Sequence, residues 1–230
     1  MKGKICVLRN GKYVEFSGDF KPGMSVIAIL EELNARTPLC DTEGREVPPI
    51  EYDCSCREKT CGACAMLING VPKLACAAFF RDEGPVVKLA PLSKFPLISD
   101  LRVDRSAIPE SVKSMKLWLD NDETAVVGDV DLQYASGECL FCGCCLEVCP
   151  NYAKDGAFFG GAGMNACYRI VSQTEKSGRK REHLAEFVKH GSSSCSISLA
   201  CERVCPAEIP HSVIISRLNR EVIRSKFKRN

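Results

Sequence analysis

The chain has 230 residues, which is enough for one large domain or two small ones. Its 31 basic residues nearly balance its 29 acidic ones, so the overall charge does not favour a nucleic-acid partner. No apolar run approaches the roughly 18 residues of a membrane span, and the first residues lack the apolar core of a signal peptide. We therefore expect a cytoplasmic protein. Sixteen cysteines in a reducing compartment are better explained as metal ligands than as disulfides.

The N-terminal segment, residues 4–34, predicts two strands followed by a helix. Two β-rich runs flank Asn10-Gly11, a dipeptide that strongly indicates a tight hairpin. Ser25 can cap a helix whose apolar residues recur at helical spacing, namely Val26, Ile29, Leu30 and Leu33. Two strands with one helix across them are typical of the start of a β-grasp fold.

The first cysteine group has the spacing of plant-type ferredoxins. A C-x4-C-x2-C motif is followed by a strand, an Asn69-Gly70 turn, a second strand and a fourth cysteine, a pattern that predicts a [2Fe-2S] cluster. The predicted ligands are Cys56, Cys61, Cys64 and Cys76. Gly62 and Ala63 keep bulky side chains out of the loop, so that backbone N–H groups can point at the cluster sulfurs. Cys54 lies outside the pattern, and we interpret it as a small buried apolar residue.

Residues 77–100 contain three prolines and are predicted to be a connector. Beyond them, apolar residues recur at helical spacing and predict a packed helix that contains Ile108, Val112, Met115 and Leu119. We place the domain boundary between these two segments. A plant-type ferredoxin domain then spans residues 1–104, and a helical domain spans residues 105–230.

The run Cys139–Pro150 reads C-x2-C-x2-C-x3-C-P, the spacing of bacterial two-cluster ferredoxins. In that motif the first three cysteines bind one iron-sulfur cluster and the fourth binds a second cluster. Gly143 gives backbone freedom where the chain passes close to the cluster. A structural zinc site is the alternative, but zinc closes with four ligands and usually shows two separated cysteine pairs. Cys144 is then a free thiol or an alternative ligand.

The third cysteine group, at 195–205, completes a two-cluster pattern. By the crossover rule, the ligands of a [4Fe-4S] cluster are Cys139, Cys142, Cys145 and Cys205. Those of the other cluster are Cys149, Cys195 and Cys201. Ser198 stands where this cluster would take a further cysteine, so we predict a [3Fe-4S] cluster with Ser198 facing the vacant corner. A [4Fe-4S] cluster with Ser198 or Cys144 as its fourth ligand is the alternative. Between the two groups, the glycines of 160–163 are expected to let a helix pack tightly against the cluster loop.

A plant-type motif followed by a two-cluster motif resembles the iron-sulfur subunit of the succinate dehydrogenase and fumarate reductase (complex II) family. The resemblance covers nearly the whole chain, and its most specific passages are Ser55–Glu58, Cys61–Cys64, Val71–Cys76, Asp100–Asp104, Cys139–Pro150 and Glu202–Pro206. It implies an α+β chain, with an N-terminal β-grasp plant-type ferredoxin domain followed by an all-α bacterial-type two-cluster ferredoxin domain. It also implies a flavoprotein partner that interconverts succinate and fumarate at a covalently held FAD. The clusters would relay electrons between that flavin and a quinone in membrane anchor subunits, which would place the chain at the cytoplasmic membrane.

The chain shows no flavin, nicotinamide or substrate site, so we expect no catalytic residue and a relay of single electrons. The sequence departs from the family at the distal end. Tyr152-Ala153-Lys154 stands where many quinone-linked members show a Trp pair, Ser196 where succinate dehydrogenases carry a His, and Ala207 where relatives place a Lys. We therefore assign no quinone-binding residue. The alternatives are the iron-sulfur subunit of a related flavoprotein reductase, which acts on another enoate or uses a non-quinone donor, and a free ferredoxin-like carrier.

Overall fold

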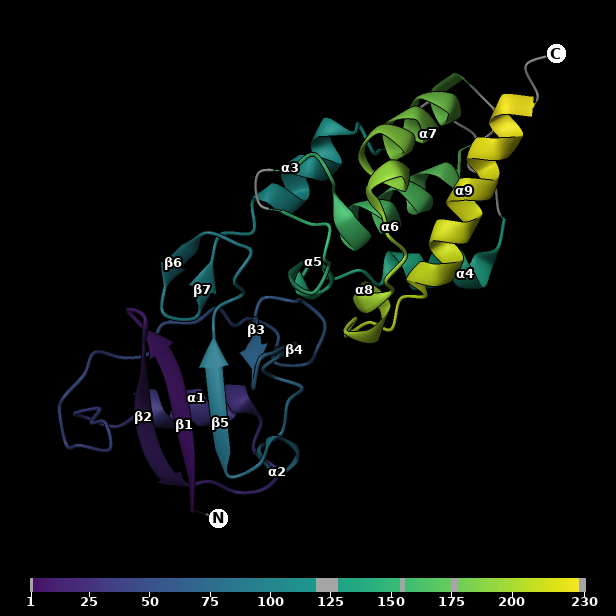
Figure 1. The fold of residues 1–230 in the computed structure, drawn as a ribbon. Helices are drawn as coiled ribbons and strands as arrows, with labels where there is room; N and C mark the ends of the chain where they lie inside the picture. The colour runs from purple at the N-terminus through teal and green to yellow at the C-terminus, as the bar shows by residue number, and fades with distance from the viewer. Residues whose placement is uncertain (1, 119–127, 154–155, 175–177, 228–230) are drawn as a thin grey trace. The chain divides into compact units, whose positions relative to one another are not determined.

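The protein is described by a computed structural model that covers residues 2–118, 128–153, 156–174 and 178–227 (Figure 1). The chain divides into two compact units, Met1–Asp104 and Arg105–Asn230. Strands dominate the first unit and helices dominate the second.

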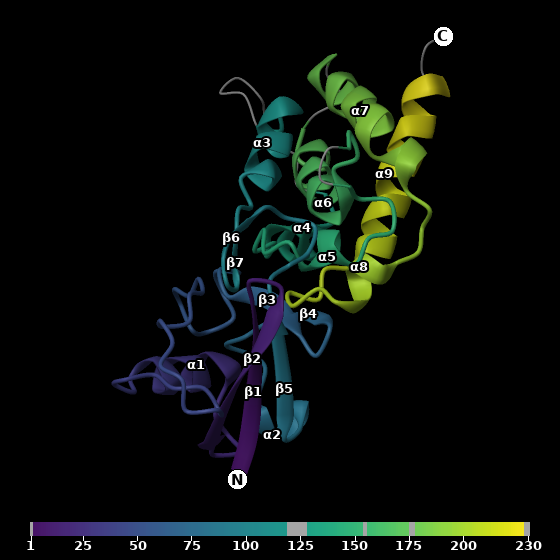
Figure 2. The same cartoon turned by 60° about the vertical axis from the view of Figure 1, so that its left-hand side comes forward.

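A five-stranded mixed sheet forms the first unit, in the order β2-β1-β5-β3-β4. Its strands are β1 (Lys2–Arg9), β2 (Lys12–Asp19), β3 (Ala65–Ile68), β4 (Val71–Leu74) and β5 (Val86–Ala90). Only the β1–β5 pair within this sheet is parallel. Helix α1 (Val26–Asn34) crosses one face of the sheet, as the two views in Figures 1 and 2 show. Its apolar face is buried, as expected for the helix of a β-grasp fold.

Both predicted hairpins and the predicted helix cap are confirmed. Asn10 and Gly11 have φ values of 49° and 78°, and Asn69 and Gly70 have 51° and 80°. Two successive left-handed residues form the turn that matches the twist of antiparallel strands. Ser25 Oγ accepts a hydrogen bond from the N–H of Ala28 over 3.3 Å and so caps α1.

The prediction of a connector over residues 77–100 is wrong. This segment contains helix α2 (Phe80–Glu83), strand β5 and strand β6 (Leu97–Ser99), which pairs with β7 (Arg102–Val103). Strand β5 is short and lies between two prolines, but Val87 and Leu89 alternate with more exposed residues and are fully buried. Its partners β1 and β3 are far away in sequence, so no local hairpin signal marked it as a strand.

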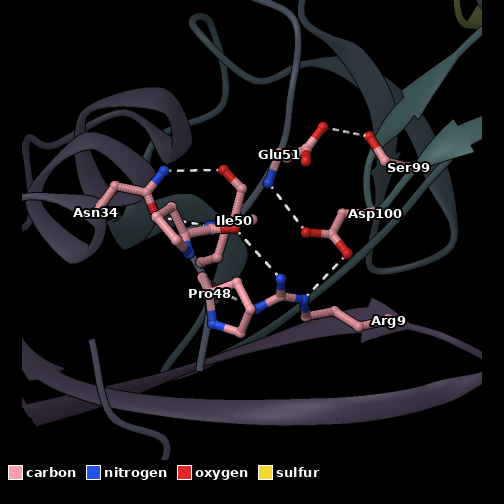
Figure 3. A network of polar contacts seen from close by, with 8 residues as sticks. Arg9, Asn34, Pro48, Ile50, Glu51, Ser99 and Asp100 are labelled. Atoms are coloured by element: carbon pink, nitrogen blue, oxygen red, sulfur yellow. Dashed lines mark hydrogen bonds and ion pairs between the residues drawn. The ribbon is translucent and has the colours of Figure 1, made fainter. Parts of the chain in front are cut away.

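A network of polar contacts holds the segment that leads into the first cysteine loop (Figure 3). Asn34 of α1 exchanges two hydrogen bonds of 2.8 Å with the backbone of Ile50. Asp100 accepts from the N–H of Glu51 over 3.0 Å and forms an ion pair of 3.0 Å with Arg9 of β1. The Arg9 and Asp100 side chains are largely buried, so the pair is better shielded from solvent than a surface ion pair. The cysteine loop therefore begins from an anchored backbone.

The second unit is helical. Its helices are α3 (Ala107–Ser114), α4 (Val130–Gly137), α5 (Cys144–Glu147), α6 (Gly160–Val171), α7 (Gly178–His190), α8 (Ala200–Arg203) and α9 (His211–Phe227), with a 3-10 turn at Ser192–Ser194. Helix α6 packs against α3, α4, α5, α7 and α9 and is almost entirely buried. The predicted 108–119 helix ends earlier, at Ser114, and Leu119 lies outside the described residues. In the described part of the chain, no helix has the length and apolar character needed to cross a bilayer.

Candidate metal centres

The first cysteine loop wraps backbone donors around Cys56. The N–H groups of Glu58 and Thr60 each donate to Cys56 Sγ over 3.3 Å. The Thr60 side chain adds a hydrogen bond, and together these donors lower the pKa of Cys56 to about 6. A thiol with such a pKa is mostly thiolate at neutral pH, which is the form that binds metal.

Left-handed residues give this loop its shape. Arg57, Lys59 and Gly62 have φ values of 61°, 60° and 75°. Repeated reversals of this kind turn successive N–H groups toward the inside of a loop. The N–H of Ala63 accordingly donates to Cys61 Sγ over 3.5 Å, as the small residues at 62 and 63 led us to expect. The loop therefore offers its sulfurs several donors without a bulky side chain at Gly62.

Cys64 and Cys76 complete the predicted set from the two ends of the β3–β4 hairpin. Cys64 directly precedes β3, Cys76 follows β4, and the two thiols are hydrogen-bonded to each other. Burial and the neighbouring Cys76 raise the pKa of Cys64 to about 12. Metal binding at Cys64 must therefore displace the proton of its thiol.

Cys54 is half-buried, and burial raises its pKa although Arg57 hydrogen-bonds it.

In the second unit, four cysteines from two distant segments line one hollow. They are Cys139, Cys142, Cys145 and Cys205. The remaining lining is largely apolar and includes Phe141, Ala162 and Ile209, with His211 as a polar side chain. The N–H of Ile209 donates to Cys205 Sγ over 3.5 Å. The fold therefore brings Cys205 to the three cysteines of the central motif.

Cys144 lies beside this hollow and contacts one of its thiols. Its side chain is fully buried and hydrogen-bonds Cys142, which is the largest of the effects that lower the pKa of Cys142 to about 7. The same contact and burial raise the pKa of Cys144 well above its ordinary value. Cys144 is thus the donor of the pair and Cys142 the acceptor. Gly143, with a φ of 90°, makes the turn that precedes them.

Cys149, Cys195 and Cys201 form a separate group. The thiols of Cys149 and Cys195 interact electrostatically with Cys201, and burial raises the pKa of Cys201 to about 11. Ser198 lies between two left-handed residues, Ile197 and Leu199, and its carbonyl accepts from Arg203 over 3.4 Å.

The three positions that depart from the family lie in different surroundings. The hydroxyl of Ser196 donates to the Asn151 side chain over 2.7 Å. Ala207 lines the hollow that contains Cys205, and Lys154 lies outside the described residues.

The glycines at the start of α6 pack against both cysteine segments, as predicted. A Cβ at Gly160 would lie 2.3 Å from Leu146 Cδ2 in α5. At Gly161 it would lie 3.0 Å from the ring of His211 and 3.2 Å from Cys201 Cβ. Helix α6 therefore approaches the cysteine segments at a distance that only glycine allows.

The donor sets fit iron-sulfur clusters. Each group offers soft thiol ligands, which suit such clusters. In the predicted [2Fe-2S] and [4Fe-4S] ligand sets, backbone N–H groups also donate hydrogen bonds to the cysteine sulfurs. Among the described residues, no three His, Cys, Asp or Glu side chains lie close enough together to hold one single ion. One polar side chain that lines the hollow, His211, was not predicted from the sequence.

Comparisons with known proteins agree with this description. Residues 7–110 match the family of 2Fe-2S iron-sulfur cluster binding domains, and residues 135–209 match the 4Fe-4S dicluster domain. The chain is 32% identical over 223 residues to the succinate dehydrogenase iron-sulfur subunit of Bacillus subtilis. The matched region covers 93% of this chain and 87% of the relative. It is 31% identical over 196 residues to a fumarate reductase iron-sulfur subunit of Escherichia coli, with 80% of each chain covered.

The fold has a solved counterpart as well. A chain from the structure described as "Mycobacterium smegmatis Sdh1 complex in the apo form" superposes with a TM-score of 0.79 at 23% identity, over 99% of this chain and 98% of that chain. This likeness confirms the predicted α+β architecture of a sheet domain followed by a helical domain. Given its two cluster-binding domains and the identity to curated relatives over most of its length, the chain belongs to the family of succinate dehydrogenase and fumarate reductase iron-sulfur subunits.

Proposed function

We propose that eleven of the cysteines hold three clusters and that this chain relays single electrons through them. The proposed [2Fe-2S] ligands are Cys56, Cys61, Cys64 and Cys76. The proposed [4Fe-4S] ligands are Cys139, Cys142, Cys145 and Cys205, and those of the third cluster are Cys149, Cys195 and Cys201. The observation that carries the proposal is the position of Cys205, which lines the hollow of the central motif, whereas Cys149 and Cys195 interact with Cys201.

The third cluster is a [3Fe-4S] cluster in this proposal. Its group has three cysteines, and Ser198 stands at the position of the missing fourth. A hydroxyl is a harder and less acidic ligand than a thiol, so it is a poor substitute at an iron–sulfur corner. The neighbouring left-handed residues Ile197 and Leu199 bend the backbone on both sides of Ser198.

The chain's own residues contribute ligands, hydrogen bonds and exclusion of water. When bound, the clusters supply one-electron chemistry. Backbone N–H groups that donate to the sulfurs of Cys56, Cys61 and Cys205 stabilise negative charge on these sulfurs. The apolar lining of the hollow around Cys139 and Cys142 keeps water away. Both features set the reduction potentials of the bound groups.

The partners follow from the family. An FAD-containing flavoprotein subunit exchanges electrons with the [2Fe-2S] end, and the distal acceptor at the other end is a quinone held by membrane anchor subunits. Succinate and fumarate are interconverted on the flavoprotein, and this chain holds no substrate. Attachment through the anchor subunits places the chain at the cytoplasmic face of the membrane.

Iron analysis and electron paramagnetic resonance (EPR) of the purified complex test the proposal. We expect about nine irons per chain and a [3Fe-4S] signal in the oxidised protein. About ten irons without that signal would overturn the assignment of the third cluster. Zinc in place of iron would overturn the whole proposal. Co-purification identifies the flavoprotein and any anchor subunit, and succinate oxidation and fumarate reduction by the complex test the substrate.

Replacing Ser198 with cysteine tests the third cluster directly. Ser198→Cys should complete a fourth ligand, add one iron per chain and remove the oxidised [3Fe-4S] signal. Ser196→Cys is the matched control, because it adds a thiol to the same loop at a residue whose hydroxyl contacts Asn151. A Ser198→Cys spectrum identical to that of the wild type would contradict the proposed role of this position.

A further inference from the structure

A short loop between α8 and α9 carries Cys205 into the hollow of the central motif. Hydrogen bonds from backbone N–H groups shape this loop around the cysteine. The N–H of Cys205 donates to the carbonyl of Glu202 over 3.3 Å, and the N–H of Glu208 donates to the carbonyl of Cys205 over 3.1 Å. The N–H of Ile209 donates to Cys205 Sγ over 3.5 Å. These bonds fold the loop locally, so its position in the hollow depends on how its two ends are held.

The side chain of Glu202 joins those two ends. Glu202 lies in α8, between Cys201 and Cys205 in the sequence, and its Oε2 accepts a hydrogen bond from the N–H of Ser212 over 2.6 Å. Ser212 is the second residue of α9, and the first N–H groups of a helix have no partner within that helix. A carboxylate at this end of a helix also interacts favourably with the helix dipole. The contact is short and charge-assisted, which places it among the stronger hydrogen bonds.

The start of α9 is itself held in the core of the second unit. His211, the first residue of α9, is only 1% exposed. Its Nδ1 donates to the carbonyl of Ile209 over 3.0 Å, because a carbonyl oxygen can only accept. The His211 ring also lies against α6, where a Cβ at Gly161 would come within 3.0 Å of it. Glu202 therefore ties α8 to a helix whose first turn is already fixed.

We propose that Glu202 is a positioning residue for Cys205, and that its carboxylate holds the loop between α8 and α9 where Cys205 reaches the hollow. The inference rests on the proposed assignment of Cys205 as a [4Fe-4S] ligand. A cluster that loses the hold of one cysteine can lose the iron at that corner. When the loaded complex is oxidised with ferricyanide, a [4Fe-4S]²⁺ cluster without this hold should release one Fe²⁺, transfer one electron to ferricyanide and become [3Fe-4S]⁺. Unfolding would instead release all the iron of the second unit.

The first test compares variants of two glutamates in the purified, iron-loaded complex. Glu202→Ala removes the acceptor, and Glu202→Gln keeps an acceptor oxygen on a side chain of the same length. Glu208→Ala is the matched control, because it removes the same charge from an exposed side chain of the same loop. After oxidation with ferricyanide, Glu202→Ala should lack about one iron per chain and show about twice the oxidised [3Fe-4S] signal of the wild type. Glu202→Gln should keep more iron than Glu202→Ala, and Glu208→Ala should match the wild type.

Three results of this comparison would overturn the inference. The first is full iron content and the wild-type spectrum in Glu202→Ala, which would limit the carboxylate to capping α9. The second is an equal loss of iron in Glu208→Ala, which would attribute the loss to the removed charge. The third is a Glu202→Gln complex that keeps no more iron than Glu202→Ala.

The second test needs no variant. Amides in the first turn of a helix exchange quickly unless a group outside the helix accepts from them. In the iron-loaded wild-type complex, hydrogen exchange resolved to single amides should show that Ser212 is protected, and fast exchange at Ser212 would overturn the inference. A wild-type complex without a [4Fe-4S] signal would overturn the ligand assignment itself, so the two failures are distinguishable.

Discussion

Gly160 at the start of α6 allows the packing argument to be tested with a single added methyl group. Its φ of 62° is left-handed, and such a conformation costs a residue with a Cβ about 1–2 kcal/mol. The new methyl carbon would also lie 2.3 Å from Leu146 Cδ2. Leu146 is buried in α5 and has little space to move away, and overpacking of this kind typically costs about 1–3 kcal/mol. Gly160→Ala should therefore destabilise the second unit by about 2–5 kcal/mol.

Gly160→Ala should also weaken metal binding in the second unit, because Leu146 lies between Cys145 and Cys149 in the sequence. Hydrogen-exchange mass spectrometry of the iron-loaded protein should show faster exchange in α6, and iron analysis should show partial loss of iron from the second unit.

Gly11→Ala is the control for backbone strain alone. Gly11 has a φ of 78°, and a Cβ there would meet no heavy atom within 4 Å. Gly11→Ala should lower the stability of the first unit only by the cost of the left-handed backbone conformation, about 1–2 kcal/mol. Hydrogen exchange in the peptides of β1 and β2 measures this loss. If Gly160→Ala costs no more than Gly11→Ala, the close approach of α6 to α5 does not restrict this position, and the packing argument fails.

Two further substitutions test the hydrogen bonds to the thiols. Cys144→Ala should keep the full iron content, because Cys144 is a donor to Cys142 in the structure, and it should lower the [4Fe-4S] potential; loss of iron would identify Cys144 as a ligand instead. Thr60→Val removes the side-chain donor that contributes most to the low pKa of Cys56, while the two N–H donors remain. We expect a [2Fe-2S] potential lower by less than about 59 mV, measured by redox titration, and an unchanged or higher potential would contradict the assigned role of the hydroxyl.

Features with a local cause were predictable from the sequence. The Asn-Gly dipeptides at 10–11 and 69–70 form the expected turns, because two consecutive residues that tolerate positive φ are sufficient to close a hairpin. Ser25 caps α1 for the same local reason. The cysteine spacings led to the two cluster-binding domains and the family, since a cluster takes several ligands from one short loop. The ligand sets and the form of the third cluster stay predictions.

Strand β5 shows where local reasoning stopped. Its five residues lie between Pro85 and Pro91, and the prolines led to the prediction of a connector. The strand exists because β1 and β3 supply its hydrogen bonds and because Val87 and Leu89 fill the core. Those partners come from other parts of the chain, so the strand's stability was not visible in its own sequence.

The cysteine spacings, the two hairpins and the family could be read from the amino-acid order, because each of these depends on neighbours along the chain. Which cysteines from separate segments meet became visible only in the folded chain. It placed Cys205 in the hollow of the central motif, and it placed His211 in the same hollow. Burial of these thiols depends on how distant segments pack around them, and such packing exists only after the chain has folded.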